Sequence, residues 1–108
     1  MTYRALMVRR WNPADRDRIA EIFAAHDRTE LPAQIGATRR TLFGFHDLYF
    51  HLIEAEDDFR QRLFAAVQDQ RFRVVDDELA GLLVPYVPDA PSMAEAQAQP
   101  FYDWRRQA

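Results

Sequence analysis

The chain has 108 residues, a length that fits one domain with a single hydrophobic core. Its formal charge of −3, with 48% hydrophobic and 29% charged residues, is ordinary for a globular protein and argues against a broad nucleic-acid surface. The apolar runs are far shorter than the roughly 20 residues that span a bilayer, so we expect a cytoplasmic protein without a membrane segment.

Periodic apolar residues divide the chain into strands and helices. Alternation of apolar and polar residues is typical of the strands, and apolar residues three and four positions apart are typical of the helices. Asn12 followed by Pro13 marks the start of the first helix, and Asp57 or Asp58 can cap the second. In chain order, the sequence predicts a strand over 3–11, a helix from 12 to about 28, a loop over 29–36, strands over 37–45 and 48–55, a helix after 58, a turn over 74–78, a strand over 79–87 and a tail over 88–108.

The order of these elements is β-α-β-β-α-β, the ferredoxin-like arrangement of an α+β domain with an antiparallel sheet. We expect one domain over 1–108, in which 1–87 form the core and 88–108 form a tail. Within the tail, 88–99 should be a loop and 101–104 a short, strand-like aromatic patch. The predicted buried stripes of the two helices are Ile19, Ile22, Phe23 and His26 in the first and Phe59, Leu63 and Val67 in the second.

Two helices can cover only one face of such a sheet. The residues that we assign to the uncovered face are too apolar for bare contact with water, so we expect a homodimer whose sheets enclose a pocket. The alternative is a sheet covered by its own C-terminal tail. The residues assigned to the uncovered face include Met7, Trp11, Leu42, Tyr49 and Ile53.

A histidine, His51, lies in the middle of the apolar strand over 48–55. If the turn before this strand has only two residues, Leu42 faces His51, and Arg40 lies diagonal to it on the same face, roughly 7–8 Å away at the backbone. Arg39 then falls on the helix-facing side. A turn longer by one residue would exchange the two faces. Either His51 is a core histidine bonded to a backbone carbonyl, or its face lines a cavity in which a proton is transferred.

Several residue types that carry chemistry are absent. The chain has no cysteine and no lysine, and its only serine, Ser92, lies in the tail. These absences exclude a thiolate nucleophile, a cysteine-bound zinc and a lysine Schiff base, and they argue against a serine hydrolase. His46 and His51 face opposite ways on the chain, so we expect no three-histidine metal site. We expect no metal and no organic cofactor.

Histidine, aspartate and arginine therefore carry the predicted chemistry. His51 is a candidate general base or acid, and His26 with Asp27 is a second candidate at the end of the first helix. Arg40 stays protonated and can donate hydrogen bonds to an enolate or phenolate oxygen. The structural alternatives are a satisfied core histidine, a solvated helix end and an interface ion pair. The candidate substrate-binding residues are Tyr49, Ile53, Leu42, Trp11 and Arg9.

Four segments of the chain form a recognisable pattern. They are YRALMVRRWNPAD (3–15), HDRTELPAQIGATRRTLFGFHDLYFHLIEAEDD (26–58), LLVPYV (82–87) and FYDW (101–104). Together they resemble the TcmI-like family of aromatic polyketide cyclases, the tetracenomycin-type cyclases. The resemblance implies a ferredoxin-like homodimer of the dimeric α+β barrel type that needs no metal or organic cofactor.

The resemblance also implies a function. It predicts a cyclase that closes a ring in an aromatic, type II polyketide intermediate by intramolecular aldol-type condensation and dehydration, in transient contact with a polyketide synthase or an acyl carrier protein. Two alternatives stay open. One is a cofactor-independent monooxygenase of the dimeric α+β barrel class that acts on anthrone-like polyketides, and the other is a non-catalytic polyketide-binding module. The general base is left open among His51, His26 and Asp27.

Overall fold

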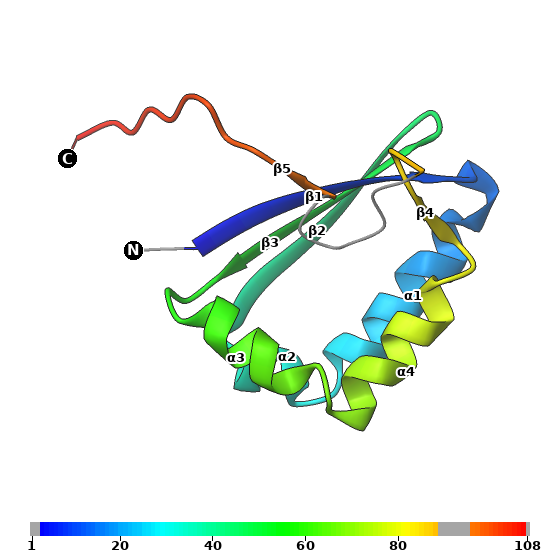
Figure 1. The fold of residues 1–108 in the computed structure, drawn as a ribbon, viewed down its shortest axis with the longest axis horizontal. Helices are drawn as coiled ribbons and strands as arrows, with labels where there is room; N and C mark the ends of the chain where they lie inside the picture. Colours follow the sequence, from blue (N-terminus) through cyan, green and yellow to red (C-terminus); the bar gives the residue numbers. More distant parts are fainter. Residues whose placement is uncertain (1–2, 89–95, 108) are drawn as a thin grey trace.

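The computed structural model describes residues 3–88 and 96–107 and places a layer of helices against an antiparallel sheet (Figure 1). If α3 and α4 are taken as one helical segment, the order of the main elements is the β-α-β-β-α-β that the sequence predicts. The strands are β1 (Tyr3–Trp11), β2 (Ala37–Phe45), β3 (Leu48–Ala55), β4 (Leu83–Pro85) and β5 (Gln97–Ala98). The helices are the 3-10 helix η1 (Pro13–Asp15), α1 (Arg16–Asp27), α2 (Leu31–Gln34), α3 (Phe59–Ala66) and α4 (Gln70–Leu79).

The sheet has the strand order β2-β3-β1-β4, and β5 pairs with β1. Neighbouring strands are antiparallel throughout, which confirms the predicted ferredoxin-like class. The register between β2 and β3 is also the predicted one, because Leu42 pairs with His51 and Arg40 pairs with Ile53. His46 in the two-residue turn has a φ of 53°, in the left-handed region that tight hairpin turns use.

The end of β1 holds this turn in place. The Trp11 backbone N–H donates to the Asp47 carbonyl (3.1 Å), and the Trp11 indole N–H donates to the His46 carbonyl (2.9 Å). Arg10 adds a hydrogen bond from Nη1 to the Asp47 carboxylate (2.9 Å). These contacts fix the turn length, and the turn length fixes which residues of β2 and β3 share a face.

The second half of the chain departs from the sequence predictions. Residues 74–78, expected to form a turn, lie inside α4, and the strand expected over 79–87 is limited to β4. The α4 helix is capped by Asp69, whose side chain accepts a hydrogen bond from the Arg71 N–H (2.8 Å), and it buries Val75. Two adjacent valines are typical of a strand, but β propensity depends strongly on context, and here the packing of one apolar helix face decides the structure.

Three smaller predictions also fail. The loop expected over 29–36 contains α2, which buries Leu31. Val67 lies just beyond the end of α3 and is 36% exposed, so it is not part of the buried stripe. In the tail, the strand is β5, whereas 101–104 has no regular structure and the remainder of the expected loop, 89–95, lies outside the described residues.

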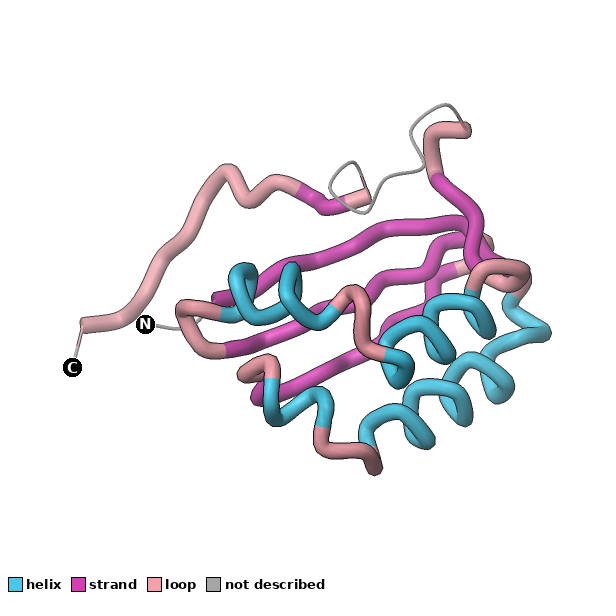
Figure 2. Tube along the Cα trace, turned by 60° about the horizontal axis from the view of Figure 1, so that its bottom comes forward, coloured by secondary structure: helices cyan, strands magenta, loops and turns pink. Residues whose placement is uncertain are grey.

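The helices lie on one side of the sheet, over the face that carries the odd-numbered residues of β1 and β3 (Figure 2). Ala5 and Ile53 pack there with Phe59 of α3, and Tyr49 packs with Phe23 of α1. The assignment of these odd-numbered residues to the uncovered face is therefore wrong. Alternation shows which residues share a face, but both faces of this sheet are apolar, so alternation does not show which one the helices cover. The misassigned residues are Met7, Trp11, Leu42, Tyr49 and Ile53.

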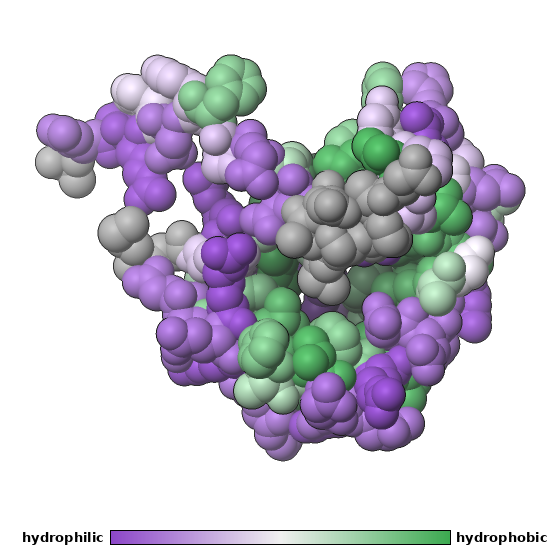
Figure 3. Space-filling model, in the orientation of Figure 1, coloured by the Kyte–Doolittle hydropathy of each residue, from purple (hydrophilic) through white to green (hydrophobic). Residues whose placement is uncertain are grey.

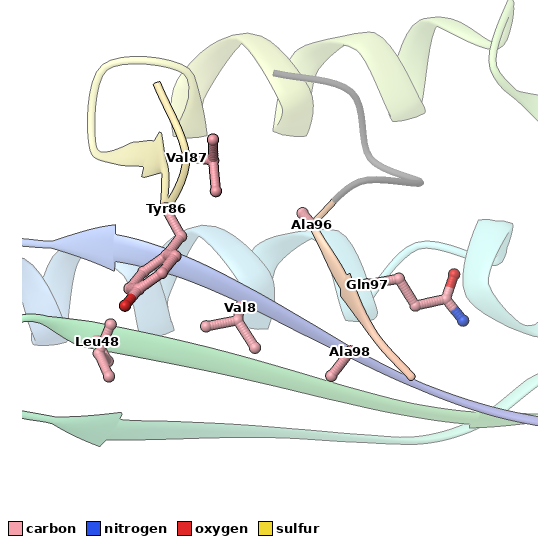
Figure 4. Close-up of a pocket in the computed structure, with 7 residues that line it drawn as sticks. All are labelled: Val8, Leu48, Tyr86, Val87, Ala96, Gln97 and Ala98. Carbon is pink, nitrogen blue, oxygen red and sulfur yellow. The ribbon is translucent and has the colours of Figure 1, made fainter. Parts of the chain in front are cut away.

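The opposite side of the sheet, here called the open face, carries apolar residues with no helix over them (Figure 2). Arg39, expected on the helix side, lies there instead with a 73% exposed side chain, 3.9 Å from the Glu54 carboxylate. A hollow of about 320 Å³ on this face is lined by residues of β1, β3, β5 and the segment after β4 (Figure 4). The apolar residues of the open face are Leu6, Val8, Phe43, Leu48, Phe50 and Leu52.

Gly44 provides a test of how closely Trp11 packs over the β2–β3 hairpin. A Cβ atom at Gly44 would overlap Cζ2 of the Trp11 indole and lie 2.8 Å from its Cη2. We predict that Gly44→Ala lowers the free energy of unfolding by about 1–3 kcal/mol, as overpacked core substitutions do. Urea unfolding measures the change.

Gly81→Ala is the matched control for this substitution, because a Cβ atom there meets nothing within 4 Å. Its free energy of unfolding should be equal to that of the wild type or slightly higher. Equal stability of the two variants would contradict the close packing of Trp11 on Gly44.

Candidate active site

A guanidinium between the sheet and α1 organises the candidate site. Arg40 of β2 donates from Nε to both Asp27 carboxylate oxygens (3.1 Å each) and from Nη2 to Asp27 Oδ1 (2.9 Å). Its Nη1 lies 2.9 Å from Nε2 of His51 on β3. The Arg40 side chain is only 13% exposed. A guanidinium carries five N–H groups, so two of them have no partner among the described residues.

An aromatic ring completes this arrangement. The Arg40 guanidinium carbon lies 4.7 Å from the centroid of the Phe23 ring, and the His51 ring meets Phe23 edge-on with its centroid 5.2 Å away. Phe23, His26 and Asp27 are three and four residues apart on α1, so they share one face of that helix. The helix thus delivers a carboxylate, an imidazole and an apolar ring to the same side of the sheet.

His51 is held in its neutral form by this environment. Burial, the Arg40 charge and the Arg9 charge, in that order, lower the pKa of His51 to about 3. A guanidinium only donates hydrogen bonds, so Nε2 is the acceptor and the imidazole proton lies on Nδ1. Titration near neutrality, the property that made His51 a candidate base in the sequence, does not hold for this residue.

His26 differs from His51 in its contacts. Burial is the largest cause that lowers the pKa of His26, and the Arg40 charge is the second. The Asp27 charge opposes them, and the Arg71 charge adds a smaller lowering. The side chain is half-buried, and its imidazole has no hydrogen-bond partner among the described residues. His26 is thus a neutral imidazole at pH 7 whose nitrogens are available to a ligand.

Asp27 was expected to orient an imidazole or to act as a base. Its two carboxylate oxygens instead accept hydrogen bonds from Arg40, and its side chain is 40% exposed. A bidentate pair of this kind fixes the plane of the guanidinium. The carboxylate therefore orients Arg40, which in turn meets His51.

The predicted substrate-binding residues divide into two groups. Tyr49, Trp11 and Leu42 pack in one cluster with Phe23, and Arg9 pairs with Tyr49 across the strands. The Tyr49 and Trp11 rings lie 6.0 Å apart. Ile53 lies in the neighbouring cluster beneath α2 and α3.

Two features of the site were not predicted from the sequence: the part of Phe23 in it and the pairing of Asp27 with Arg40. The available signal was spacing: a phenylalanine three and four residues before a histidine and an aspartate places all three on one helix face. Phe23 was assigned to the core stripe alone. Its ring is buried, as predicted, but it also contacts two of the polar residues of the site.

The hollow on the open face offers different chemistry. Its lining contains one phenol and no imidazole, carboxylate or guanidinium, as the sticks in Figure 4 show. On the face drawn in Figure 3, hydrophobic side chains gather between the sheet and the helices, where the surface is hollowed. The groups suited to proton transfer and anion stabilisation thus lie on the helix side of the sheet. The hollow is lined by Val8, Leu48, Tyr86, Val87, Ala96, Gln97 and Ala98.

Metal ligands do not gather in the described part of the chain. Across residues 3–88 and 96–107, no group of three or more histidine, aspartate or glutamate side chains is arranged to hold a metal ion. His46 lies in the β2–β3 turn, where its ring packs edge-on against Phe45 at 4.4 Å. Every helix in these ranges is too short or too polar to cross a bilayer.

Comparison with known proteins gives consistent matches over the length of the chain. Residues 3–105 match the family model described as polyketide synthesis cyclase. Tetracenomycin F2 cyclase of Streptomyces glaucescens is 49% identical over 104 residues, which cover 96% of this chain and 95% of the relative. Polyketide synthase CurG of Streptomyces cyaneus is 34% identical over 105 residues, covering 96% of this chain and 98% of the relative.

The fold is similar as well. The solved structure of tetracenomycin F2 cyclase from Streptomyces glaucescens, described as a type-II polyketide cyclase, superposes with a TM-score of 0.89 at 48% identity. The superposition covers 97% of this chain and 99% of that chain.

The environment of His51 leads to a prediction about acid stability. Its folded pKa of about 3 lies below the ordinary histidine value of 6.5, so the unfolded chain binds more protons between these two pH values. The wild type should therefore lose stability as pH falls from about 6.5 towards 3, and His51→Gln should show a shallower loss. Urea unfolding at pH steps across this window measures the difference.

The exposed histidine of the hairpin supplies the control. His46→Asn suits a left-handed position and should keep the wild-type dependence of stability on pH. Equal pH dependence of His51→Gln and the wild type would contradict a neutral, buried His51.

Proposed function

The chain belongs to the polyketide synthesis cyclase family, and on that premise we propose that it closes a ring in an aromatic polyketide intermediate by intramolecular aldol-type condensation and dehydration. The observation that carries the proposal is the Arg40 guanidinium, held by Asp27 and His51 with two N–H groups left for a ligand. The reaction needs no cofactor, because acid–base groups and an anion donor are sufficient for it.

Arg40 acts as the electrophilic group. A methylene between two ketones is fairly acidic, and its deprotonation places negative charge on a ketone oxygen. A guanidinium that is already oriented and largely shielded from water stabilises such a charge far better than solvent does. The same two N–H groups can serve the alkoxide that forms when the carbanion attacks the acceptor carbonyl and the new C–C bond is made.

His26 acts as the base. Its neutral imidazole removes a proton from the methylene and returns it to the alkoxide of the aldol adduct, which becomes a hydroxyl. It then removes the second proton of the same carbon and delivers it to the departing hydroxide, so that a C=C bond forms and water is released. The pKa of His26 is lowered, which keeps it in the free-base form at neutral pH. His51 acts through Arg40: it accepts a hydrogen bond from Nη1 and thereby positions the guanidinium.

The surrounding apolar groups position the substrate. Phe23, Trp11 and Leu42 supply flat or branched surfaces around the polar residues. A flexible poly-β-ketone has many conformations, and selecting one in which the reacting carbons meet contributes a large share of the rate. The shape of this lining then determines which ring closes.

Product mass separates this function from the two alternatives. The protein is incubated with a linear or partly cyclised polyketide, and the product is analysed by mass spectrometry and NMR. Cyclisation with dehydration loses one water, whereas a monooxygenase reaction adds oxygen and requires O₂. Binding without turnover supports a binding module and contradicts the proposal.

Arg40→Lys is a direct test of the guanidinium. It keeps the positive charge but loses the planar fork that Asp27 and His51 hold. We predict a loss of roughly 10²–10³-fold in kcat, the magnitude for removal of one oxyanion donor. Thermal unfolding of the variant checks that the fold is retained, and a folded variant with wild-type kcat would rule out directional stabilisation by Arg40.

The pH dependence of kcat distinguishes the two histidines. Because the pKa of His26 is lowered, wild-type kcat should fall only below pH 6.5. His26→Gln should lose roughly 10²–10⁴-fold in kcat, and the remaining kcat should no longer fall at acid pH. In His51→Gln the fall in kcat at acid pH should remain. If this fall were lost in His51→Gln and kept in His26→Gln, His51 would be the base.

The open face supports a homodimer. Its apolar residues form a surface of the kind that a soluble monomer rarely leaves uncovered, and a second copy would cover it in a sheet-to-sheet contact. The active sites would then lie within each chain, beneath its own helices. We also propose that the dimer works in the cytoplasm, in transient contact with a polyketide synthase or an acyl carrier protein.

Leu6 and Phe50 lie at the centre of the proposed dimer contact, on adjacent strands of the open face. We predict that light scattering gives the mass of a dimer at micromolar concentration and that Phe50→Arg shifts the mass to that of a monomer. Phe64→Arg, at an 81% exposed position of α3 on the other side of the molecule, is the control. A stable wild-type monomer would contradict the proposed contact.

A further inference from the structure

The hydroxyl of Tyr49 is buried without a hydrogen-bond partner. Tyr49 is 2% exposed, and in the described residues its hydroxyl is the buried side-chain polar atom that lacks a partner. Most buried polar atoms in proteins are paired, and an unpaired one is costly and calls for an explanation. Neither the packing nor the proposed mechanism above uses this hydroxyl.

Tyr49 lies next to the candidate active site. It precedes His51 by two residues on β3, so the two side chains are on the same face of the sheet. Tyr49 and Phe23 belong to one buried cluster, and Phe23 contacts both the His51 ring and the Arg40 guanidinium. The Arg40 charge also acts on the Tyr49 phenol. The phenol and the guanidinium therefore share one compartment between the sheet and α1.

Packing alone holds the Tyr49 ring in place. The Trp11 indole lies 6.0 Å from it, and Gly44, which pairs with Tyr49 across the strands, leaves the space that the indole occupies. Apolar side chains of α1 and β4 belong to the same buried cluster as this ring. A phenylalanine would pack in the same position, so the fold does not require the hydroxyl.

The hydroxyl keeps its proton at neutral pH. Burial raises the pKa of Tyr49 well above its ordinary value, and the charges of Arg40 and Arg9 oppose this only in part. A protonated phenol in an apolar compartment is a hydrogen-bond donor. It suits an oxygen that carries partial or full negative charge.

We propose that the Tyr49 hydroxyl donates a hydrogen bond to a ketone or enolate oxygen of the bound substrate, as a second donor beside Arg40. The inference rests on the proposed function and specifies its substrate class as a 1,3-diketone. Such a unit has two oxygens that flank the methylene to be deprotonated. If one of these oxygens accepts a hydrogen bond from the Arg40 guanidinium and the other accepts one from the Tyr49 phenol, the methylene between them is held in place. The two donors then share the negative charge of the anion that forms.

Tyr49→Phe tests the proposal through two effects of opposite sign. Activity should fall by roughly 10²–10³-fold in kcat, because a donor to the developing oxyanion is lost. The urea midpoint of the ligand-free protein should stay the same or rise, because an unpaired buried polar atom is removed. Tyr86→Phe is the matched control: Tyr86 is half-exposed, lies at the hollow of the open face, and should show neither effect.

Binding of an unreactive probe separates this inference from the proposed function. Benzoylacetone, an aromatic 1,3-diketone, should bind about tenfold more weakly to Tyr49→Phe than to the wild type. If the wild type cyclises no polyketide but binds the probe in a Tyr49-dependent way, the proposed function fails and the inference stands. Wild-type kcat and probe affinity in Tyr49→Phe would overturn the inference, as would a lower urea midpoint.

Discussion

A single guanidinium charge, that of Arg40, sets the properties of the groups around it. It is largely shielded from water, and a charge in that position needs partners from the protein. Asp27 of α1 and His51 of β3 supply them, so the bidentate ion pair joins the helix layer to the sheet. Burial, and then the same charge, lower the pKa of both neighbouring histidines, and the charge opposes the rise that burial gives the pKa of Tyr49. One residue thus connects packing, protonation and chemistry.

The electrostatics of this arrangement favour enolate chemistry. A buried cation keeps adjacent imidazoles neutral, since a second positive charge beside it would be repelled. It also stabilises an anion that forms within reach. A neutral histidine can accept a proton from carbon while the cation holds the negative charge that results. In the proposed mechanism the base and the electrophile therefore support each other through the field of one residue.

The pairing of β2 with β3 could be predicted from the sequence. Side chains alternate between the two faces of a strand, and a turn of two residues leaves only one register for the two strands that it joins. His51, Arg40, His26 and Asp27 were predicted from residue type as candidates. In the structure Arg40 contacts His51 and Asp27, and its charge acts on His26. The covered face could not be identified, because Leu6, Phe50 and Leu52 make the open face as apolar as the helix side. Residues 74–78 were predicted as a turn but lie in α4, because this helix packs against α1, which is distant in sequence. The protonation state of His51 depends on burial and on Arg40, neither of which a sequence displays.

In the proposed dimeric cyclase the two faces of the sheet carry separate tasks, and this separation follows from the period of a strand. Along β3, each odd-numbered residue from Tyr49 to Ala55 points towards the helices, and each even-numbered residue points away. Substitutions on the open face can therefore alter association while the guanidinium, imidazole and phenol keep their positions. Substitutions on the helix side act on the lining of the site within one chain. If the proposed function and dimer hold, substitutions at Trp11, Leu42 or Phe23 change ring selectivity and leave the assembly of the chains unchanged.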